Sequence, residues 1–369
     1  MKWIILLKTL LVMFGMLVVS GFNIVHAGQS KSQLDSPPVV KKYGTDPTRY
    51  FLPKTAIDTT EVPNIALKSS DKESDPLPYF KITTGTYLFF GNIAQIDKYN
   101  RGWNGNAGFV VTSEGVVVID SLGTPRLGRR MISTIRSITD KPIKYLIITH
   151  NHPDHSYGAI AFRDLGGVKV VSHAGALDYI NSNKIDNSVD YRRSIIKEDM
   201  AGFAAVAPDI PIAGKRFSSY KLSVGDKTFE IYNTGQHHSF GDLVVFQTDE
   251  KIVWISDLAF NQRTTFMGDG NTRQAITAQD WLLAKFPDAK LMIPGHGSAQ
   301  TPPFPMVRKT QDYMKRLRST LNRAMDDGLD LLEAVDQADF KDWRNIRLYG
   351  LNQRANANFV YRELEQENF

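Results

Sequence analysis

The sequence predicts an α/β protein built as a four-layer αβ/βα sandwich, with two sheets face to face and helices on their outer faces. Two observations support this prediction. From about residue 79 to residue 173, apolar runs typical of strands alternate with segments of helical spacing, as in βαβ units. A second series of strand-like runs follows, and the chain turns helical from residue 303 onward. We therefore expect a main domain at residues 79–302 and a helical C-terminal segment at residues 303–369.

The first half of the main domain begins with a predicted hairpin. In AGFVVTSEGVVVIDS, two β-branched runs flank the turn from Ser113 to Gly115. In PRLGRRMISTIRSIT, apolar residues recur at helical spacing, which predicts a helix with one buried face. PIKYLIITH is a continuous apolar run and predicts a buried strand. SYGAIAFRDLGG predicts a short helix ended by two glycines, and VKVVSH predicts another strand.

The second half repeats the strand pattern. Strands are predicted for KTFEIYNTG, DLVVFQT, KIVWISD and AKLMIPGH. Residues 174–216, between the two halves, predict a mixture of helix and loop. In the C-terminal segment, one helical face carries the apolar residues Val307, Met314, Leu317 and Leu321.

The N-terminus resembles an export signal. A short basic start precedes an apolar stretch, and the small residues Val25 and Ala27 stand before a predicted cleavage point. We expect residues 1–27 to be a signal peptide and the mature protein to be periplasmic or secreted. An uncleaved membrane anchor is the alternative, because the apolar run approaches spanning length. Residues 28–78 are polar, contain prolines and show no periodicity, so they predict an N-terminal extension along the domain surface.

Composition narrows the function. The net charge of +5 is spread along the chain, whereas nucleic-acid binders usually gather their basic residues in a stripe, so we expect no nucleic-acid partner. The chain has no cysteine, which excludes disulfides and thiolate ligands. Any metal ion must therefore be held by His, Asp or Glu.

Residues 149–156 read THNHPDHS and crowd four metal-binding side chains into one short turn: His150, His152, Asp154 and His155. The stretch begins where a predicted strand ends and stops where a helix begins, which is a usual place for a ligand site in α/β proteins. His150 and His152 can point at one place, and Asp154 and His155 at a second place nearby. Such spacing is rare by chance, so it predicts metal binding.

Later strands supply further ligands. His237 and His238 follow one predicted strand, Asp257 ends the next, and His296 follows a third in a glycine-flanked loop. All of them lie at the carboxyl end of a β-run, as His150 does. We therefore expect them to meet at one rim of the fold.

The series H-x-H-x-D-H, followed by a His, an Asp and a His on later strands, resembles the metallo-β-lactamase superfamily over residues 79–300. The resemblance implies the metallo-β-lactamase fold and two zinc ions. It assigns one metal to His150, His152 and His238, the other to Asp154, His155 and His296, and makes Asp257 the bridging ligand. The family pattern after Gly235 selects His238 over His237, which would then be a neighbour or a substrate contact. Asp120 is expected to hold a ligand from behind or to fix a nearby loop. Ser256 replaces a glycine that is common in the family, with little expected effect on the metals.

The branch of the superfamily is less sharply marked. Without cysteine, the chain cannot be a lactamase with a cysteine ligand. The cysteine-free lactamases typically lack an Asp at the position of Asp257, which counts against them but leaves them as an alternative. The motifs GDLVVF, SDLAFNQRTTFMGDGNT and NANFVYRELE resemble the quinoprotein relay system zinc metallohydrolases. These exported proteins accompany pyrroloquinoline-quinone-dependent alcohol oxidation, so a quinoprotein oxidation system is an expected context. The resemblance names no substrate.

The expected activity is hydrolysis of a small-molecule ester, thioester, lactone or lactam, with a hydroxide between two zinc ions attacking the carbonyl carbon. Asp257 would set the metal spacing and Asp154 would orient the hydroxide. Arg263, on the loop that also carries Asp269, could bind an acidic substrate group, or it could form a surface ion pair. His237 is the other candidate substrate contact.

Two other functions compete with hydrolysis. One is a dioxygenase that binds a single iron through two histidines and Asp257. The other is a non-catalytic metal-binding partner of a periplasmic oxidation system.

Overall fold

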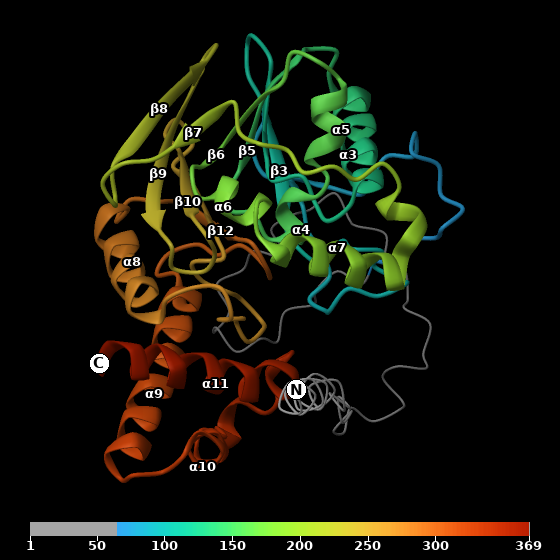
Figure 1. Cartoon of the computed structure of the whole chain (residues 1–369). Coiled ribbons are helices and arrows are strands. Elements are labelled where there is room, and N and C mark those ends of the chain that lie inside the picture. The colour runs from blue at the N-terminus through green and yellow to red at the C-terminus, as the bar shows by residue number, and fades with distance from the viewer. Residues whose placement is uncertain (1–64, 369) are drawn as a thin grey trace, which may run out of the picture. The chain divides into compact units, whose positions relative to one another are not determined.

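The computed structural model describes residues 65–368 of the 369-residue chain. These residues form two sheets with helices on their outer faces, so the predicted four-layer αβ/βα sandwich is confirmed (Figure 1). The predicted signal peptide at residues 1–27 lies outside the described residues, as does most of the extension at 28–78. The boundary expected at residue 303 stays a prediction.

The first sheet has seven strands in chain order: β1 (Phe80–Lys81), β2 (Thr86–Phe89), β3 (Ala107–Val111), β4 (Val116–Ile119), β5 (Ile143–Ile148), β6 (Lys169–His173) and β7 (Ile210–Ile212). β3 and β4 form the predicted antiparallel hairpin. β4, β5, β6 and β7 then pair in parallel through crossover connections. Strands buried on both faces need continuous apolar runs, which is what the sequences of β4 and β5 provide.

The second sheet has five strands in the order β12-β11-β10-β9-β8. They are β8 (Ser219–Val224), β9 (Lys227–Gly235), β10 (Asp242–Gln247), β11 (Ile252–Ser256) and β12 (Leu291–Pro294). β8 to β11 form an antiparallel meander, and β12 joins β11 in parallel. The sequence did not predict β1, β2, β7 or β8. β7 lies within the segment expected to be helix and loop, and β8 is an edge strand with only two buried residues.

The main core lies between the two sheets. Val117 and Ile147 of the first sheet share one buried cluster with Ile231, Val245 and Trp254 of the second. Gly108 on β3 explains how closely the sheets approach, because a Cβ there would lie 2.2 Å from the Trp254 ring. Only glycine leaves room for this indole.

Helices cover the outer face of the first sheet. α3 (Pro125–Ile138) and α5 (Ala159–Asp164) pack against this face, and α4 (Pro153–Ser156) leads from β5 to α5. α6 (Ala176–Ile180), α7 (Asn183–Ile196) and η1 (Lys197–Met200) share a separate buried cluster. α3 begins as its sequence predicts, with Thr124 accepting a hydrogen bond from the Leu127 amide and a proline in the first turn. Leu77, in the described part of the extension, donates its amide to Thr134 of α3 at 2.7 Å.

The outer face of the second sheet packs against α8 (Thr272–Lys285) and the beginning of α9 (Pro305–Asp326). α9 continues into a separate core with α10 (Leu331–Gln337), η2 (Lys341–Trp343) and α11 (Tyr349–Asn368). Figure 1 shows α11 crossing α9. Within residues 65–368, no helix is both long and apolar enough to cross a membrane.

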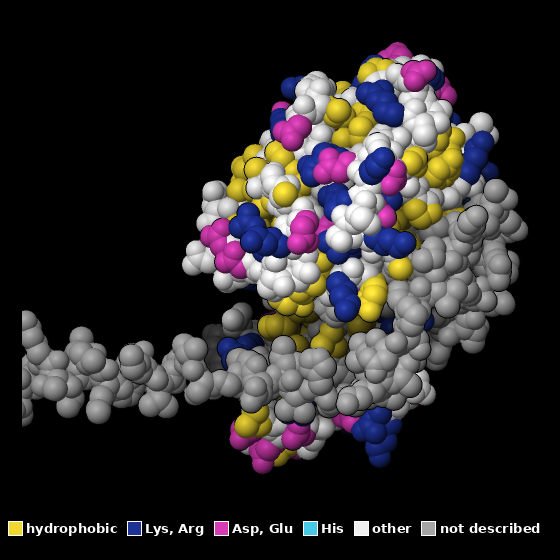
Figure 2. All heavy atoms as spheres, turned by 90° about the vertical axis from the view of Figure 1, so that its right-hand side faces the viewer, with side chains coloured by type: hydrophobic (Ala, Val, Ile, Leu, Met, Phe, Trp, Pro, Cys, Tyr) yellow, Lys and Arg dark blue, Asp and Glu magenta, His cyan; other side chains and the backbone are white. Residues whose placement is uncertain are grey.

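The surface mixes charges of both signs. On the face shown in Figure 2, lysine and arginine side chains are interspersed with aspartate and glutamate, and apolar groups lie between them. No histidine is visible on that face, because the histidines of the THNHPDHS motif are buried.

Candidate metal centre

The predicted ligand residues gather at one rim of the sandwich, where strands of both sheets end. His150 follows β5, Asp257 follows β11 and His296 follows shortly after β12. His238 lies in the loop between β9 and β10. The carboxyl ends of parallel strands share an edge, so residues far apart in the sequence meet there.

The first cluster consists of His150, His152, His238 and Asp257. Each offers a ligand atom, and these atoms all lie within 4.8 Å of one another. His238 Nε2 lies 3.0 Å from Asp257 Oδ2, and His150 Nε2 lies 3.8 Å from the same oxygen. Three imidazoles and a carboxylate at this spacing suit zinc or iron.

The second cluster consists of Asp154, His155 and His296, whose ligand atoms are equally close together. His296 Nε2 lies 3.3 Å from Asp154 Oδ2 and 3.5 Å from His155 Nε2. α4 places Asp154 and His155 at the start of its single turn, directly after the extended His152. The tight turn therefore separates the first pair of motif ligands from the second pair.

Asp257 connects the two clusters. Its Oδ1 lies 3.6 Å from His155 Nε2, and its Oδ2 lies 3.4 Å from His296 Nε2. The same Oδ2 lies 3.0 Å from His238 Nε2 in the first cluster. One carboxylate thus touches ligand atoms of both clusters, which is the geometry of a bridging ligand.

Unsatisfied buried atoms show that these residues suit a metal. His150 Nε2, His238 Nε2 and Asp257 Oδ1 are buried, and none makes a well-directed hydrogen bond in the described part of the chain, although His238 Nε2 lies 3.0 Å from Asp257 Oδ2. A buried polar atom without a partner costs about 1–3 kcal/mol, so such atoms normally serve a purpose. All three belong to the first cluster, where a metal ion would satisfy them.

Charge is balanced within the clusters. Burial opposes ionisation of the Asp257 carboxyl, but the imidazoles of His296, His155 and His238 hold its pKa well below its usual range. Burial lowers the pKa of His155, whereas the carboxylates of Asp257 and Asp120 raise it to about 9. Asp257 is therefore ionised at neutral pH, and a metal at His155 must displace a proton.

Asp120 supports the second cluster by contacting the His155 ring nitrogen that faces away from the cluster. Its Oδ2 lies 2.9 Å from His155 Nδ1, and its Oδ1 accepts the Thr149 amide at 2.8 Å. A carboxylate on Nδ1 leaves Nε2 of His155 for a metal. The expectation that Asp120 fixes a nearby loop matches these contacts.

Ser256 contacts His150 of the first cluster directly, a contact that the sequence did not predict. Its hydroxyl lies 3.0 Å from His150 Nδ1 and 2.7 Å from the Thr149 hydroxyl. Its backbone φ of 48° is in the left-handed region, which explains why glycine is common at this position. The serine keeps this backbone and adds a hydrogen bond to a ligand.

Asn104 was not predicted from the sequence, yet it joins two residues of the second cluster. Its Nδ2 donates to Asp154 Oδ2 at 2.9 Å, and its carbonyl oxygen lies 2.7 Å from His296 Nδ1. Gly105 follows it, and a Cβ there would lie 3.1 Å from the His155 ring. The only sequence feature that could have pointed to Asn104 is the Asn-Gly pair that it forms with Gly105, close to the start of β3.

His237 lies outside both clusters. Its Nε2 lies 3.1 Å from the Thr234 hydroxyl, and its Nδ1 lies 3.7 Å from Asp242 Oδ2. Asp242 also accepts the backbone amide of His238 at 2.8 Å and so shapes the loop that presents this histidine. Of the two neighbouring histidines, the structure brings His238 to the first cluster, as the family pattern indicated.

Arg263 is buried beside the clusters, with only 9% of its surface exposed. Arg263 forms no ion pair among residues 65–368, and its Nε donates to the Thr264 carbonyl oxygen at 3.3 Å. The surface ion pair considered from the sequence is therefore not found among these residues. Its guanidinium lies 5.4 Å from the centroid of the Phe260 ring, which stacks on His296 at 5.7 Å. Burial lowers the pKa of Arg263, and the carboxylates of Asp257 and Asp154 oppose that shift.

The C-terminal helices hold the loop that carries Arg263. Asn352 and Asn356 of α11 donate their side-chain amides to the carbonyl oxygens of Thr264 and Thr265. The Thr264 amide donates to the Arg347 carbonyl at 2.9 Å. The helical segment is therefore a support for one wall of the metal centre.

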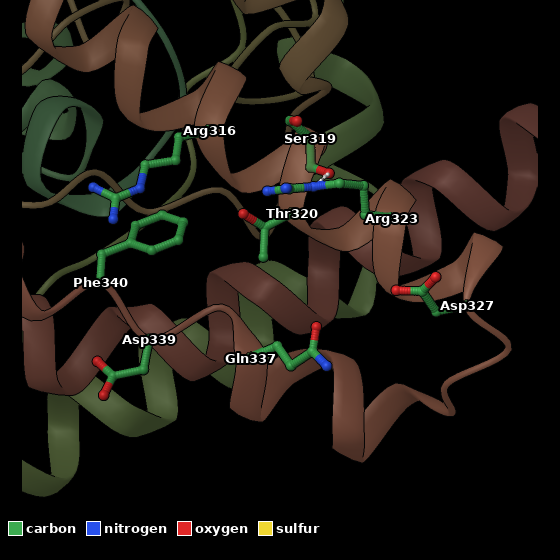
Figure 3. A pocket seen from close by; sticks show the side chains of 8 residues that line it. All are labelled: Arg316, Ser319, Thr320, Arg323, Asp327, Gln337, Asp339 and Phe340. Carbon is green, nitrogen blue, oxygen red and sulfur yellow. Dashed lines mark hydrogen bonds between the residues drawn. The ribbon is translucent and has the colours of Figure 1, made fainter.

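A separate surface cavity of about 530 Å³ lies between α9 and the segment from Gln337 to Phe340, and none of the candidate ligands lines it (Figure 3). Its lining includes Arg316, which stacks at 4.0 Å on Phe340 and is paired with Asp342 at 2.8 Å. Because its charged side chains are largely exposed or already paired, we assign it no role.

Residues 100–296 match the family model of the metallo-beta-lactamase superfamily, a stretch that contains every predicted ligand. The chain belongs to the metallo-beta-lactamase superfamily. Membership confirms the resemblance and makes the chain a metal-dependent hydrolase. The finer resemblance to quinoprotein relay proteins stays a prediction.

Individual relatives lie on different branches of the superfamily. A metallo-beta-lactamase type 2 of Elizabethkingia meningoseptica is 25% identical over 195 residues, which are 52% of this chain and 68% of that protein. A linear primary-alkylsulfatase of a Pseudomonas strain is 41% identical over only 49 residues, 13% of this chain and 9% of that protein. The chain therefore matches a small part of the alkylsulfatase.

Among solved structures, a stereoselective inverting sec-alkylsulfatase from Pseudomonas sp. is similar with a TM-score of 0.62 and 18% identity. The match covers 77% of this chain and 49% of that one, so this chain spans about half the alkylsulfatase. A metallo-beta-lactamase from Pontibacter korlensis gives a TM-score of 0.50 at 20% identity, over 65% and 99% of the two chains. At these identities, the structural similarity concerns the fold.

Proposed function

We propose that this chain is a dinuclear zinc hydrolase that cleaves a carbonyl compound of small size. The position of Asp257 is the observation that carries the proposal. Its two carboxylate oxygens lie 3.0 Å from a ligand nitrogen of the first cluster and 3.4–3.6 Å from two ligand nitrogens of the second. A centre for one metal has no need of a carboxylate shared in this way.

In this proposal, His150, His152 and His238 hold one zinc ion and Asp154, His155 and His296 hold the other. When bound, two such ions supply a Lewis acid for the substrate oxygen and lower the pKa of water towards about 7. The protein contributes a fixed ligand set. Several of these ligands are in turn held by a neighbour, as Asp120 holds His155 and Asn104 holds His296.

The chain also shields the centre from water. The Phe260 ring lies 5.6 Å from His238 and 5.7 Å from His296, so one aromatic side chain contacts a ligand of each cluster. The Phe266 ring lies 6.3 Å from His152. Apolar walls lower the local dielectric, which strengthens the hold of Asp154 and Asp257 on positive charge. Asp154 keeps a hydrogen bond from Asn104 and would orient the attacking water.

Arg263 would bind an acidic group of the substrate. It is buried, has no carboxylate partner among residues 65–368, and lies near both clusters by its interaction with Asp257 and Asp154. A guanidinium in this state favours an oxyanion that offers two acceptors.

The substrate classes to be tested are esters, thioesters, lactones and lactams. Alkyl sulfate esters form a second candidate class, favoured by the similarity to the two alkylsulfatases. The superfamily fold does not choose among them, since the loops around the metals determine specificity.

Cellular context belongs to the proposal as well. The apolar N-terminal stretch supports export to the periplasm or beyond, with cleavage after residue 27. The motifs shared with quinoprotein relay metallohydrolases support action beside a quinoprotein oxidation system.

Metal content of the protein purified without added metal is the test. We expect about two zinc ions per chain, close to one in the variant His238→Asn, and no change in the matched control His237→Asn. One iron per chain with O₂ uptake would replace the hydrolase with a mononuclear dioxygenase. Full hydrolysis by His152→Ala would contradict the dinuclear site.

A further inference from the structure

His152 differs from the other ligand histidines in the nitrogen that faces away from the metals. His150, His155 and His296 each direct Nδ1 at a protein oxygen, which leaves Nε2 for a metal. In His152 the arrangement is reversed, because Nε2 lies 3.1 Å from Asp269 Oδ2. Nδ1 is then the ring nitrogen that remains for the first cluster.

Asp269 is held in a confined loop between β11 and α8. A Cβ on Gly270 would lie 2.2 Å from the His237 carbonyl oxygen and 2.6 Å from the His238 Cα. A Cβ on Gly268 would lie 2.4 Å from the Phe266 ring. Gly270 thus allows the Asp269 loop to rest directly on the segment that carries His238, and Gly268 leaves room for the Phe266 ring.

Lys184 reaches Asp269 from another part of the fold. It lies in the first turn of α7, behind the Ser182 cap, and its Nζ pairs with Asp269 Oδ1. The same Nζ lies 5.1 Å above the Phe240 ring, in the loop after His238. The lysine side chain is 50% exposed, whereas those of Asp269 and His152 are 19% and 11% exposed. The three residues form a continuous connection from the surface to the first cluster.

We propose that Asp269 is a positioning residue for His152, and that Lys184 holds Asp269 in place from α7. Asp269 accepts the Nε2 hydrogen of His152, which fixes the ring orientation and the tautomer that presents Nδ1. Lys184 pairs with the other carboxylate oxygen, so the Asp269 side chain is held in a single orientation. The proposal rests on the proposed function only in taking His152 as a metal ligand.

Asp269→Ala removes the acceptor, and Asp269→Asn keeps a weaker one in its amide oxygen. Lys184→Met removes the anchor but keeps the aliphatic stem. Asp190→Asn is the matched control, because Asp190 is an 80% exposed carboxylate on the same helix as Lys184. Circular dichroism and thermal unfolding establish that each variant folds.

The first measurement is the tautomer of His152 in metal-free protein, read from long-range ¹H–¹⁵N NMR correlations at a pH where the ring is neutral. We expect the Nε2–H form in the parent protein and a mixture of both forms in Asp269→Ala. This readout needs no metal and no substrate, and a residue that merely stabilises the fold would not change it.

The second measurement is zinc affinity by competition with a chelator. We expect Asp269→Ala to lose about 10–100-fold, as is typical when the carboxylate behind a ligand histidine is removed. Asp269→Asn and Lys184→Met should each lose less, and Lys184→Met should add nothing in the Asp269→Ala background.

An unchanged tautomer in Asp269→Ala would overturn the proposal, and so would zinc affinity equal to that of Asp190→Asn. If Asp269→Ala fails to fold, Lys184→Met and Asp269→Asn decide by the same two readouts. Failure of the proposed function is distinguishable, because a parent protein that binds no zinc can still show the Nε2–H tautomer.

Discussion

The hydroxyl of Ser256 lies 3.0 Å from Nδ1 of His150, at a position where the backbone is in the left-handed region with φ of 48°. Ser256 is also the residue that immediately precedes Asp257. One residue thus joins the orientation of a ligand histidine to the backbone turn that presents the shared carboxylate. A non-glycine residue in this region costs about 1–2 kcal/mol, which the contacts of the serine hydroxyl offset.

This relationship predicts opposite effects on stability and on metal binding. Ser256→Gly should relieve the backbone strain, and Ser256→Ala should retain it, so we expect the glycine variant to be about 1 kcal/mol more stable than the alanine variant. Both variants lose the hydroxyl on His150 and should bind zinc more weakly than the parent protein. Urea unfolding and chelator competition measure the two effects. Equal stability of the two variants would show that the turn is not strained.

Asp257→Asn should disturb both clusters at once, because the carboxylate contacts ligand nitrogens in each. We expect metal content to fall from about two ions to one or fewer, with a loss of activity larger than the roughly 10–100-fold typical of a residue behind a ligand. Asp242→Asn is the comparison, since Asp242 shapes the His238 loop without joining a cluster. Two tightly held zinc ions in Asp257→Asn would contradict a bridging role.

Arg263→Met should affect substrate binding and leave the metals in place. The guanidinium contacts Phe260 and has no carboxylate partner among residues 65–368, so its removal leaves no ligand residue unpaired. We expect KM for acidic substrates to rise by about tenfold or more, from the loss of a charge-assisted hydrogen bond of roughly 1.5–3 kcal/mol. KM for a neutral analogue should change little. Equal changes for both substrates would indicate a purely structural role.

The C-terminal helices should contribute a pH-dependent part of the stability. Burial raises the pKa of Glu367, but hydrogen bonds from Arg318 and Arg273 outweigh it and lower the pKa below its usual value. A depressed carboxyl pKa stabilises the fold above the unfolded-state pKa of roughly 4.3, and this contribution disappears as the pH falls through the folded-state pKa.

Arg318→Met therefore should cost about 2 kcal/mol in urea unfolding at neutral pH and progressively less below about pH 4. Arg318 is 13% exposed and pairs with both Glu363 and Glu367. Arg316→Met is the matched control, because its pair with Asp342 is 46% and 62% exposed and should contribute less than about 1 kcal/mol. A cost for Arg318→Met that stays constant down to acid pH would refute this account.

Removing the metal should lower the stability of the protein without unfolding it. His150 Nε2 and Asp257 Oδ1 are buried with no hydrogen-bond partner in the described part of the chain. Zinc at 1,000 times its dissociation constant contributes roughly 4 kcal/mol, so we expect a chelator to lower Tm by about 6 °C. The shift should be reversed by zinc and be smaller in His238→Asn. An unchanged Tm in the presence of the chelator would mean that zinc does not bind the folded state.

Most of the fold could be predicted from periodicity alone. The strands β5 and β11 could be predicted from their long apolar runs, and the helices α3 and α9 from their helical spacing. The reason is that burial demands a continuous or periodic apolar pattern. The two-residue strand β1 and the edge strand β8 did not, because short or solvent-exposed strands need no such pattern. Their pairing depends on neighbours that the local sequence does not specify.

The candidate metal ligands were also within reach of the sequence, since they stand at the ends of strongly predicted strands. The residues behind them were not. Asn104 contacts His296, 192 positions away along the chain, and Asp269 contacts His152 across 117 positions. A hydrogen bond of this kind leaves no periodicity, because it is decided by where two loops meet.

The sequence by itself therefore determined the sandwich of strands and helices, the crowding of imidazole at one strand end, and the absence of any thiolate ligand. Only the tertiary structure decided that Asp257 faces both clusters, that His238 faces them while His237 turns to Thr234, and that α11 supports the Arg263 loop. The physical reason is that the apolar pattern that buries a strand or helix lies within the sequence of that element. The direction of a side chain and its distant partner are set when separate strand ends converge on one rim.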